Sequence, residues 1–309
     1  MAGFDKYDNH DNEWVKCLED PERKAVAASW LRDDTVDAWR HRRMRETLLP
    51  LIKADQLATC LTVGDGRYGT DAHFFLEQGI DCHASDMTSR LLGIAHNSGY
   101  IREYSLQNAE SLTFKDGTFD YVYCKESFHH FPRPWLAVYE MFRVARKAVI
   151  LLEPADNTCF PPRACARMLK DLGRRLIGRT SRNDERHDFE PVGNYIYSLS
   201  LSECEKFLLG MHYRWIASIG LNDYYEEGVE FCPLSGGSSV QRALKERVQR
   251  EIDRRDKRCQ KGLSPYSLLS AILFKTEPSE QVVAGLGASG WLTRQLPANP
   301  YRDIAESRV

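Results

Sequence analysis

The sequence predicts an α/β protein built on a doubly wound, mostly parallel Rossmann-like sheet, with a helical N-terminal prefix and helical insertions late in the chain. Between residues 57 and 152, short aliphatic runs alternate with segments of helical period. These runs are apolar along their length, which is typical of parallel strands covered on both faces. Because strand–helix–strand units cross over in the right-handed sense, we expect ligands at the carboxyl ends of the strands.

Each element follows from its own pattern. Apolar residues spaced by three and four from Pro21 to Ala54 predict helices, with Asp33 or Asp34 available as a cap between two of them. Beyond Glu277 we expect a small helix and then a segment, WLTRQLPANPY, that adds a strand or docks on the surface. The predicted strands between these ends are 61–63, 80–85, 119–124, 148–152, 215–219 and 266–274, and the predicted helices are 72–78, 91–97, 134–144, 164–177, 202–210 and 240–259.

The chain length of 309 residues fits one large domain with additions or two small domains. Nothing in the sequence clearly marks a second independent domain. The predicted parts are a flexible acidic arm (1–20), a helical prefix or lid (21–56), a central ligand-binding domain (57–275) with insertions at about 156–200 and 226–264, and a C-terminal extension (276–309).

The composition excludes several classes of protein. Residues are 42% hydrophobic and 28% charged, and no apolar run approaches the ~20 residues that span a bilayer, so we expect no membrane span. A net charge of -2 offers no global field for nucleic acid. Nine cysteines without a CxxC pair, and an N-terminus without the basic and apolar regions of a secretory signal, predict a cytoplasmic protein with no metal site. The oligomeric state stays open.

A glycine-rich loop follows the first predicted strand. The segment LTVGDGRYG, residues 61–69, places three glycines between a strand and a helix, where backbone N–H groups bind negative groups. Taken literally it is a G-x-G-x-x-G motif followed about twenty residues later by Asp86, as in dinucleotide-binding proteins. A merely structural strand-to-helix turn is the other interpretation of this loop.

Later segments distinguish between these interpretations. The residues NAE at 108–110 come before the run DGTFDYVYCKESFHHF at 116–131, and a helix ending in RVARKAVILLEP follows. In order and spacing these segments resemble the class I S-adenosylmethionine-dependent methyltransferases, in particular their small-molecule subgroup. The resemblance covers roughly residues 57–154 and the last strand near 266–275, and it rests on four segments that agree in order.

The resemblance implies S-adenosylmethionine as the cofactor and assigns residues to its methionine and ribose parts. Gly64 and Gly66 would pass beneath the methionine part, and Asp86 would accept hydrogen bonds from both ribose hydroxyls. The backbone carbonyl of Lys125 would accept a hydrogen bond from the ammonium group of the cofactor. This sequence has a threonine two residues before Gly64, where the family usually has an acid, so Asp65 is the carboxylate available to replace the missing charge.

The adenine end is assigned to Met87, Asn108 and Ala109. Met87 would pack on the adenine face, Asn108 would lie beside the adenine amino group, and the Ala109 backbone would lie near the ring. Each assignment has a structural alternative: Met87 can fill a gap in the core and Asn108 can form an Asx turn. Asp86 can cap the helix that follows it.

The adjacent residues His129 and His130 follow the strand at 119–124, where a base for the proton of the acceptor is needed. Adjacent side chains cannot share one direction, so we expect only one of them to face the site and favour His129. Glu126 would orient an imidazole, neutralise the sulfonium or simply lie at the surface. Glu153 would face the substrate side or be a strand-end carboxylate without function. The alternative is that both histidines only orient backbone or seal the pocket.

Basic residues gather in the segment 163–179, which is either a solvated helix face or a surface that attracts a phosphorylated or acidic acceptor. The favoured function is methyl transfer to a hydroxyl or amine of a small molecule, with a sugar or glycan precursor as the suggested acceptor. The alternatives are an NAD(P)-dependent oxidoreductase that uses the G-x-G-x-x-G loop, and a non-catalytic relative of the fold that binds a partner. No nucleic acid is expected among the partners.

Overall fold

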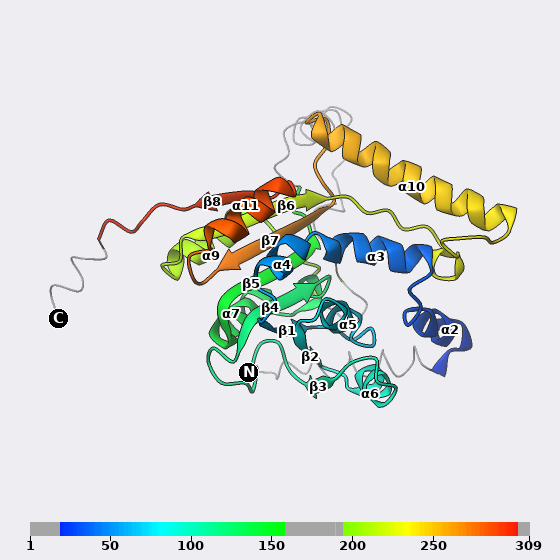
Figure 1. Cartoon of the computed structure of the whole chain (residues 1–309), viewed down its shortest axis with the longest axis horizontal. Helices are drawn as coiled ribbons and strands as arrows, with labels where there is room; N and C mark the ends of the chain where they lie inside the picture. The colour runs from blue at the N-terminus through cyan, green and yellow to red at the C-terminus, as the bar shows by residue number, and fades with distance from the viewer. Residues whose placement is uncertain (1–18, 158–188, 190–193, 302–309) are drawn as a thin grey trace, which may run out of the picture.

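An eight-stranded sheet with the strand order β3-β2-β1-β4-β5-β7-β6-β8 forms the centre of the protein (Figure 1). The computed structural model describes residues 19–157, 189 and 194–301. The strands are β1 (Thr59–Val63), β2 (Asp81–Asp86), β3 (Glu103–Leu106), β4 (Phe119–Lys125), β5 (Ala145–Pro154), β6 (Trp215–Leu221), β7 (Leu268–Phe274) and β8 (Leu292–Gln295).

The strands β1 to β5 run parallel, and β7 lies antiparallel between β5 and β6. At the far edge β8 pairs antiparallel with β6. Every residue of β4 and most residues of β5 are buried, which explains the unbroken apolar runs in the sequence. With helices on both faces, this arrangement confirms the predicted doubly wound, mostly parallel Rossmann-like sheet.

Two hydrophobic cores cover the two faces of the sheet. On one face Phe75 of α5 packs in the same cluster as Ile150 of β5, together with residues of α4, α6 and α11. On the other face Phe142 of α7 and Leu208 of α9 share a cluster with Val122 of β4. The helices are α2 (Pro21–Ser29), α3 (Val36–Glu46), α4 (Leu49–Ala54), α5 (Thr70–Glu77), α6 (Arg90–Asn97), α7 (Pro134–Val144), α9 (Leu201–Gly210), α10 (Ser239–Gln260) and α11 (Glu280–Ala288), with short 3₁₀ helices η1 (Phe128–His130) and η2 (Val229–Phe231).

The structure corrects the sequence prediction in two places. Strand β3 is missing from the prediction, because its four residues are half-exposed and carry no apolar alternation. Neither Asp33 nor Asp34 caps α3; the Thr35 hydroxyl does, accepting from the backbone N–H of Ala38 at 3.1 Å. The predicted helix 164–177, the basic segment 163–179 and residues 1–18 of the predicted arm lie outside the described residues.

Helix α10 and the end of β6 hold the prefix in place. Val36 of α3 shares a small buried cluster with Val248 and Ile252 of α10. The guanidinium of Arg40 binds both carboxylate oxygens of Asp223, with 2.9 Å between Nε and Oδ1. A buried bidentate pair of this kind is strong and directional, so it fixes α3 against the segment that follows β6.

The C-terminal extension joins the fold rather than resting on its surface. Helix α11 packs on α4, and β8 adds a strand to the sheet, one of the two expected outcomes for this segment. Trp291 is buried between them, and its indole N–H donates to the Thr47 carbonyl at 2.9 Å. Among the helices of the described segments, none has the length and apolar character needed to cross a membrane.

Replacing Trp291 with phenylalanine is expected to lower the free energy of unfolding by about 1 kcal/mol. The phenyl ring keeps most of the apolar contact but donates no hydrogen bond, so the Thr47 carbonyl loses its partner. Denaturant unfolding measures the effect. The control Tyr139→Phe, at a ring that is 47% exposed, should change stability by less than about 0.5 kcal/mol. Equal stability of Trp291→Phe and wild type would contradict the expectation.

Candidate active site at the carboxyl ends of the parallel strands

The glycine loop is clamped between the ends of β2 and β4. Gly64 adopts φ +77°, and a Cβ at this position would lie 2.4 Å from the Cβ of Ser127, so only glycine fits. The backbone N–H groups of Gly64 and Asp65 donate to the Ser85 carbonyl at 2.9 and 3.0 Å. The Ser127 hydroxyl donates to the Gly64 carbonyl at 2.7 Å. These bonds fix the loop at the edge where the parallel strands end.

The Asp65 carboxylate faces the start of α5. It accepts backbone N–H groups of Asp71 and Ala72 at 3.2 and 2.9 Å, and the Thr62 hydroxyl at 2.9 Å. Burial, followed by the nearby Asp71 carboxylate, raises the pKa of Asp65 to about 8. Asp65 therefore stabilises the loop and the first turn of the helix, and its contact with a cofactor stays a prediction.

The Asp86 carboxylate lies directly beside the glycine loop, where β2 ends. A Cβ on Gly66 would lie 2.9 Å from Asp86 Oδ2, so the second glycine permits this close approach. Oδ1 of Asp86 accepts the backbone N–H and the hydroxyl of Thr88 at 2.8 and 3.2 Å. Burial outweighs these bonds and raises the pKa of Asp86 to about 6. The half-buried Met87 follows it.

The segment after β3 comes back to Asp86. The backbone N–H of Gln107 donates to the Asp86 carbonyl at 2.8 Å, which brings Asn108 and Ala109 to the same edge. Asn108 Oδ1 accepts the backbone N–H of Glu110 at 2.9 Å, so Asn108 forms the Asx turn that was one of its two interpretations. Ala109 is buried. The structure thus brings together the residues predicted for the ribose and adenine parts.

Lys125 and Glu126 end β4 with a strained turn. Glu126 has φ +50°, a left-handed conformation that is uncommon outside glycine. Its carboxylate lies 2.8 Å from Lys125 Nζ and 3.3 Å from Nδ1 of His41 on α3. Burial opposes its charge, but these two partners hold the pKa of Glu126 well below its usual range. One expectation for Glu126 was that it orients an imidazole. It does contact an imidazole, but that ring belongs to His41 and not to the pair His129 and His130.

The histidine pair lies on η1, and Glu153 of β5 orients one member of it. His129 Nδ1 is 2.7 Å from Oε2 of Glu153, a carboxylate with no exposed surface. Oε1 of Glu153 accepts the backbone N–H groups of Ser127 and Phe128, each at 2.9 Å. The ring centroids of His129 and His130 are 3.9 Å apart. The carboxylate therefore fixes both the turn and the orientation of the His129 ring.

The comparison with known families fits this geometry. Residues 61–152 match the family model of a methyltransferase domain. Residues 61–152 therefore form a methyltransferase domain. The match runs from β1 to β5 of this methyltransferase and includes the glycine loop, Asp86 and the histidine pair. It gives no support to the oxidoreductase alternative.

No curated protein matches the sequence. Among solved structures, the chain is similar to the YcgJ protein from Bacillus subtilis, with 20% identity, a TM-score of 0.45, and coverage of 75% of this chain and 99% of that one. Magnesium protoporphyrin IX methyltransferase from Synechocystis gives 13% identity, a TM-score of 0.43 and coverage of 85% and 94%. At such low identities and TM-scores, these likenesses carry no argument about substrate or mechanism.

Two features of the methyltransferase site escaped the sequence analysis. For Glu153 the sequence analysis offered contact with substrate or no function, and it missed that this carboxylate binds His129 and the backbone of η1. His41, on the prefix, received no role, because only the folded chain brings it to Glu126. The sequence signal for Glu153 was its place as the carboxylate that directly follows the aliphatic run 148–152 of β5. Within the described segments, no group of three or more His, Cys, Asp or Glu side chains could hold a metal ion.

Proposed function

We propose that this methyltransferase moves the methyl group of S-adenosylmethionine to a hydroxyl or amine of a small molecule, with His129 as the general base. The observation that carries the proposal is the 2.7 Å contact of His129 Nδ1 with the fully buried carboxylate of Glu153. A sugar or glycan precursor is the first acceptor class to test. The absence of CxxC pairs, together with six free cysteines among the described residues, supports the further proposal of a cytoplasmic location.

The cofactor supplies an electrophilic methyl group on a sulfonium, and the chain offers a cradle that fits it. Gly66 leaves open the space beside Asp86 that a Cβ would fill, which suits a ribose diol bound by the carboxylate. Gly64 and the Lys125 carbonyl are proposed for the methionine part. Asn108, with the neighbouring Met87 and Ala109, is proposed for the adenine part.

The Glu153 carboxylate determines what the His129 ring can do. Because Oε1 is occupied by two backbone N–H groups, Oε2 is the atom that accepts the Nδ1 proton of His129. A ring protonated at Nδ1 carries its lone pair on Nε2, and the buried carboxylate stabilises the imidazolium formed when Nε2 takes a proton. The bound cofactor would supply its methyl group to the acceptor oxygen or nitrogen and be left as a thioether, and Nε2 of His129 would take the proton that the acceptor loses.

Calorimetry with S-adenosylhomocysteine and with NAD tests the proposed cofactor against its alternatives. Binding of S-adenosylhomocysteine alone supports methyl transfer, binding of NAD alone supports an oxidoreductase, and binding of neither supports a non-catalytic relative. A screen with radiolabelled methyl donor across sugars, phosphorylated sugars, phenols and amines then identifies the acceptor. Label transfer to no member of the panel, by a protein that binds S-adenosylhomocysteine, would count against a small-molecule acceptor.

A further inference from the structure

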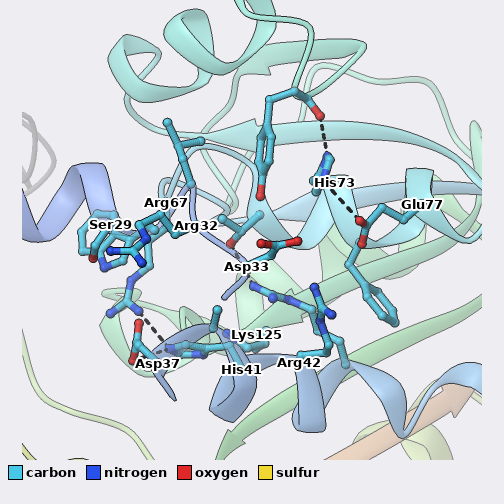
Figure 2. Close-up of a pocket in the computed structure, with 17 residues that line it drawn as sticks. Ser29, Arg32, Asp33, Asp37, His41, Arg42, Arg67, His73, Glu77 and Lys125 are labelled. Atoms are coloured by element: carbon cyan, nitrogen blue, oxygen red, sulfur yellow. Dashed lines mark hydrogen bonds and ion pairs between the residues drawn. The ribbon is translucent and has the colours of Figure 1, made fainter. Parts of the chain in front are cut away.

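A cavity of about 130 Å³ lies between the N-terminal prefix and α5 (Figure 2). The prefix contributes Trp30, His41 and Arg42 to its walls, the glycine loop contributes Arg67, β4 contributes Lys125, and α5 supplies the opposite side. This volume has room for a small ligand group rather than a single water molecule. The site proposed above uses only the Lys125 backbone, so the side chains that line this cavity still lack a function.

The cations of this cavity are not all neutralised. Arg45 pairs with Asp71 and Lys125 with Glu126, at 2.5 and 2.8 Å, and Arg32 pairs with Asp34 at 3.0 Å. Over the part of the chain that the structure describes, neither Arg42 nor Arg67 has a carboxylate within 4 Å. Among the lining carboxylates, Asp37 pairs with Arg40, Glu77 lies 3.6 Å from the His73 imidazole, and Asp33 is exposed. Arg42 and Arg67 are thus the two lining guanidiniums that keep donors for an anionic ligand.

Arg67 is held in position by neutral groups. Its guanidinium lies 4.8 Å from the centroid of the Trp30 ring and 3.2 Å from Nε2 of His41. Figure 2 shows the contact between Arg67 and His41, and it shows the His41 ring beside Lys125. Stacking on an aromatic ring orders the guanidinium and leaves its donors available for an anion.

His41 lies in the cavity wall beside Arg67. The residue is only 9% exposed, and its Nδ1 has no hydrogen bond among the described residues. Nδ1 faces the Glu126 carboxylate, with 3.3 Å between Nδ1 and Oε2. Burial and the neighbouring Lys125 lower the pKa of His41, so the ring is neutral near pH 7. Because Arg67 can only donate, Nε2 accepts from Arg67 Nη1 at 3.2 Å, and His41 helps to position the Arg67 guanidinium in the cavity wall.

We propose that this cavity binds a carboxylate or phosphate group of the methyl acceptor, with Arg42 and Arg67 as its ligands. The inference rests on the proposed function, since Arg67 and Lys125 belong to segments proposed to hold the cofactor. The cavity follows α5 from Thr70 to Glu77, a length of about 10 Å. That length exceeds what one carboxylate of the cofactor occupies, which favours a second molecule.

Titration calorimetry with inorganic phosphate and with acetate tests the site on the full chain, with and without saturating S-adenosylhomocysteine. We expect saturable phosphate or acetate binding to wild type in both states. Arg42→Gln and Arg67→Gln should each weaken it by about tenfold or more, because a bidentate charged contact is lost. The matched control Arg254→Gln, on the exposed face of α10 where Arg254 pairs with Glu251, should bind as wild type does.

Three results would overturn the inference. The first is the absence of saturable binding of either anion, and the second is equal weakening by Arg254→Gln. The third is loss of anion binding when S-adenosylhomocysteine is present, or a matching loss of S-adenosylhomocysteine affinity in Arg42→Gln and Arg67→Gln, because the cavity would then serve the carboxylate of the cofactor. Failure of wild type to bind S-adenosylhomocysteine at all contradicts the proposed function instead, and the titration without it still tests the cavity.

Discussion

Replacing His129 with alanine should lower kcat by roughly 10²- to 10⁴-fold, the range that a positioned general base contributes. The affinity for S-adenosylhomocysteine should change by less than about threefold, because no cofactor contact is proposed for the imidazole. Single-turnover transfer of labelled methyl to an identified acceptor measures the rate, and calorimetry measures the affinity. The control is His96→Ala on α6, which should match wild type in both measurements.

The substitution Glu153→Gln distinguishes a role of Glu153 in positioning the His129 ring from a role in packing alone. Glutamine keeps the size of the side chain but removes the negative charge that faces His129 Nδ1. We expect kcat to fall by about tenfold or more, and the acidic limb of the pH–rate profile to move to lower pH, because the imidazolium loses its stabilising carboxylate. A merely structural role for Glu153 would lower stability without moving that limb.

The outcome for the second histidine decides the assignment within the pair. If His130→Ala loses the turnover and His129→Ala keeps it, the base is His130 and the contact with Glu153 only shapes the turn. If both variants keep wild-type rates, neither histidine is the base. Because the two rings lie 3.9 Å apart, each variant should also be checked by unfolding measurements for displacement of its neighbour.

The sequence predicts the sheet well where burial is complete. Helix α7 has the predicted bounds Pro134–Val144, since its strong amphipathic period begins at a proline that favours the first helical position. Strand β5 is recognised from its aliphatic run but extends further at both ends. Strand β3 escapes because Glu103–Leu106 is short and half-exposed, and only pairing with β2 makes it a strand.

The candidate site likewise has residues that the sequence predicts and contacts that it does not. Gly64, Gly66 and Asp86 are predictable because a local motif places them, and the structure brings the loop and Asp86 together. The Glu153–His129 contact joins residues 24 positions apart in the sequence. It depends on two strands ending at the same edge of the sheet, which no local spacing encodes. Likewise, the His41–Glu126 contact requires the prefix to fold back over the end of β4.

Asp86→Ala should weaken S-adenosylhomocysteine binding by more than about tenfold, because hydrogen bonds to a charged acceptor are worth roughly 1.5–3 kcal/mol. Wild-type affinity should also depend on pH. Burial raises the pKa of Asp86 to about 6 in the free protein, and the ionised form is the one that accepts both ribose hydroxyls. Affinity should therefore fall by about tenfold from pH 7 to pH 5. Asp86→Asn should bind weakly and lose this slope.

Stability measurements separate this effect from unfolding, because the two respond to pH in opposite directions. A carboxyl whose pKa is higher in the folded protein binds protons more tightly when folded, so its ionisation destabilises the fold. The contribution of Asp86 to stability thus rises as pH falls through about 6, and that of Asp65 rises as pH falls through about 8. Affinity that falls between pH 7 and pH 5 while stability holds or rises would identify the carboxylate of Asp86 as the cause. An affinity independent of pH over that range would remove Asp86 from the cofactor site.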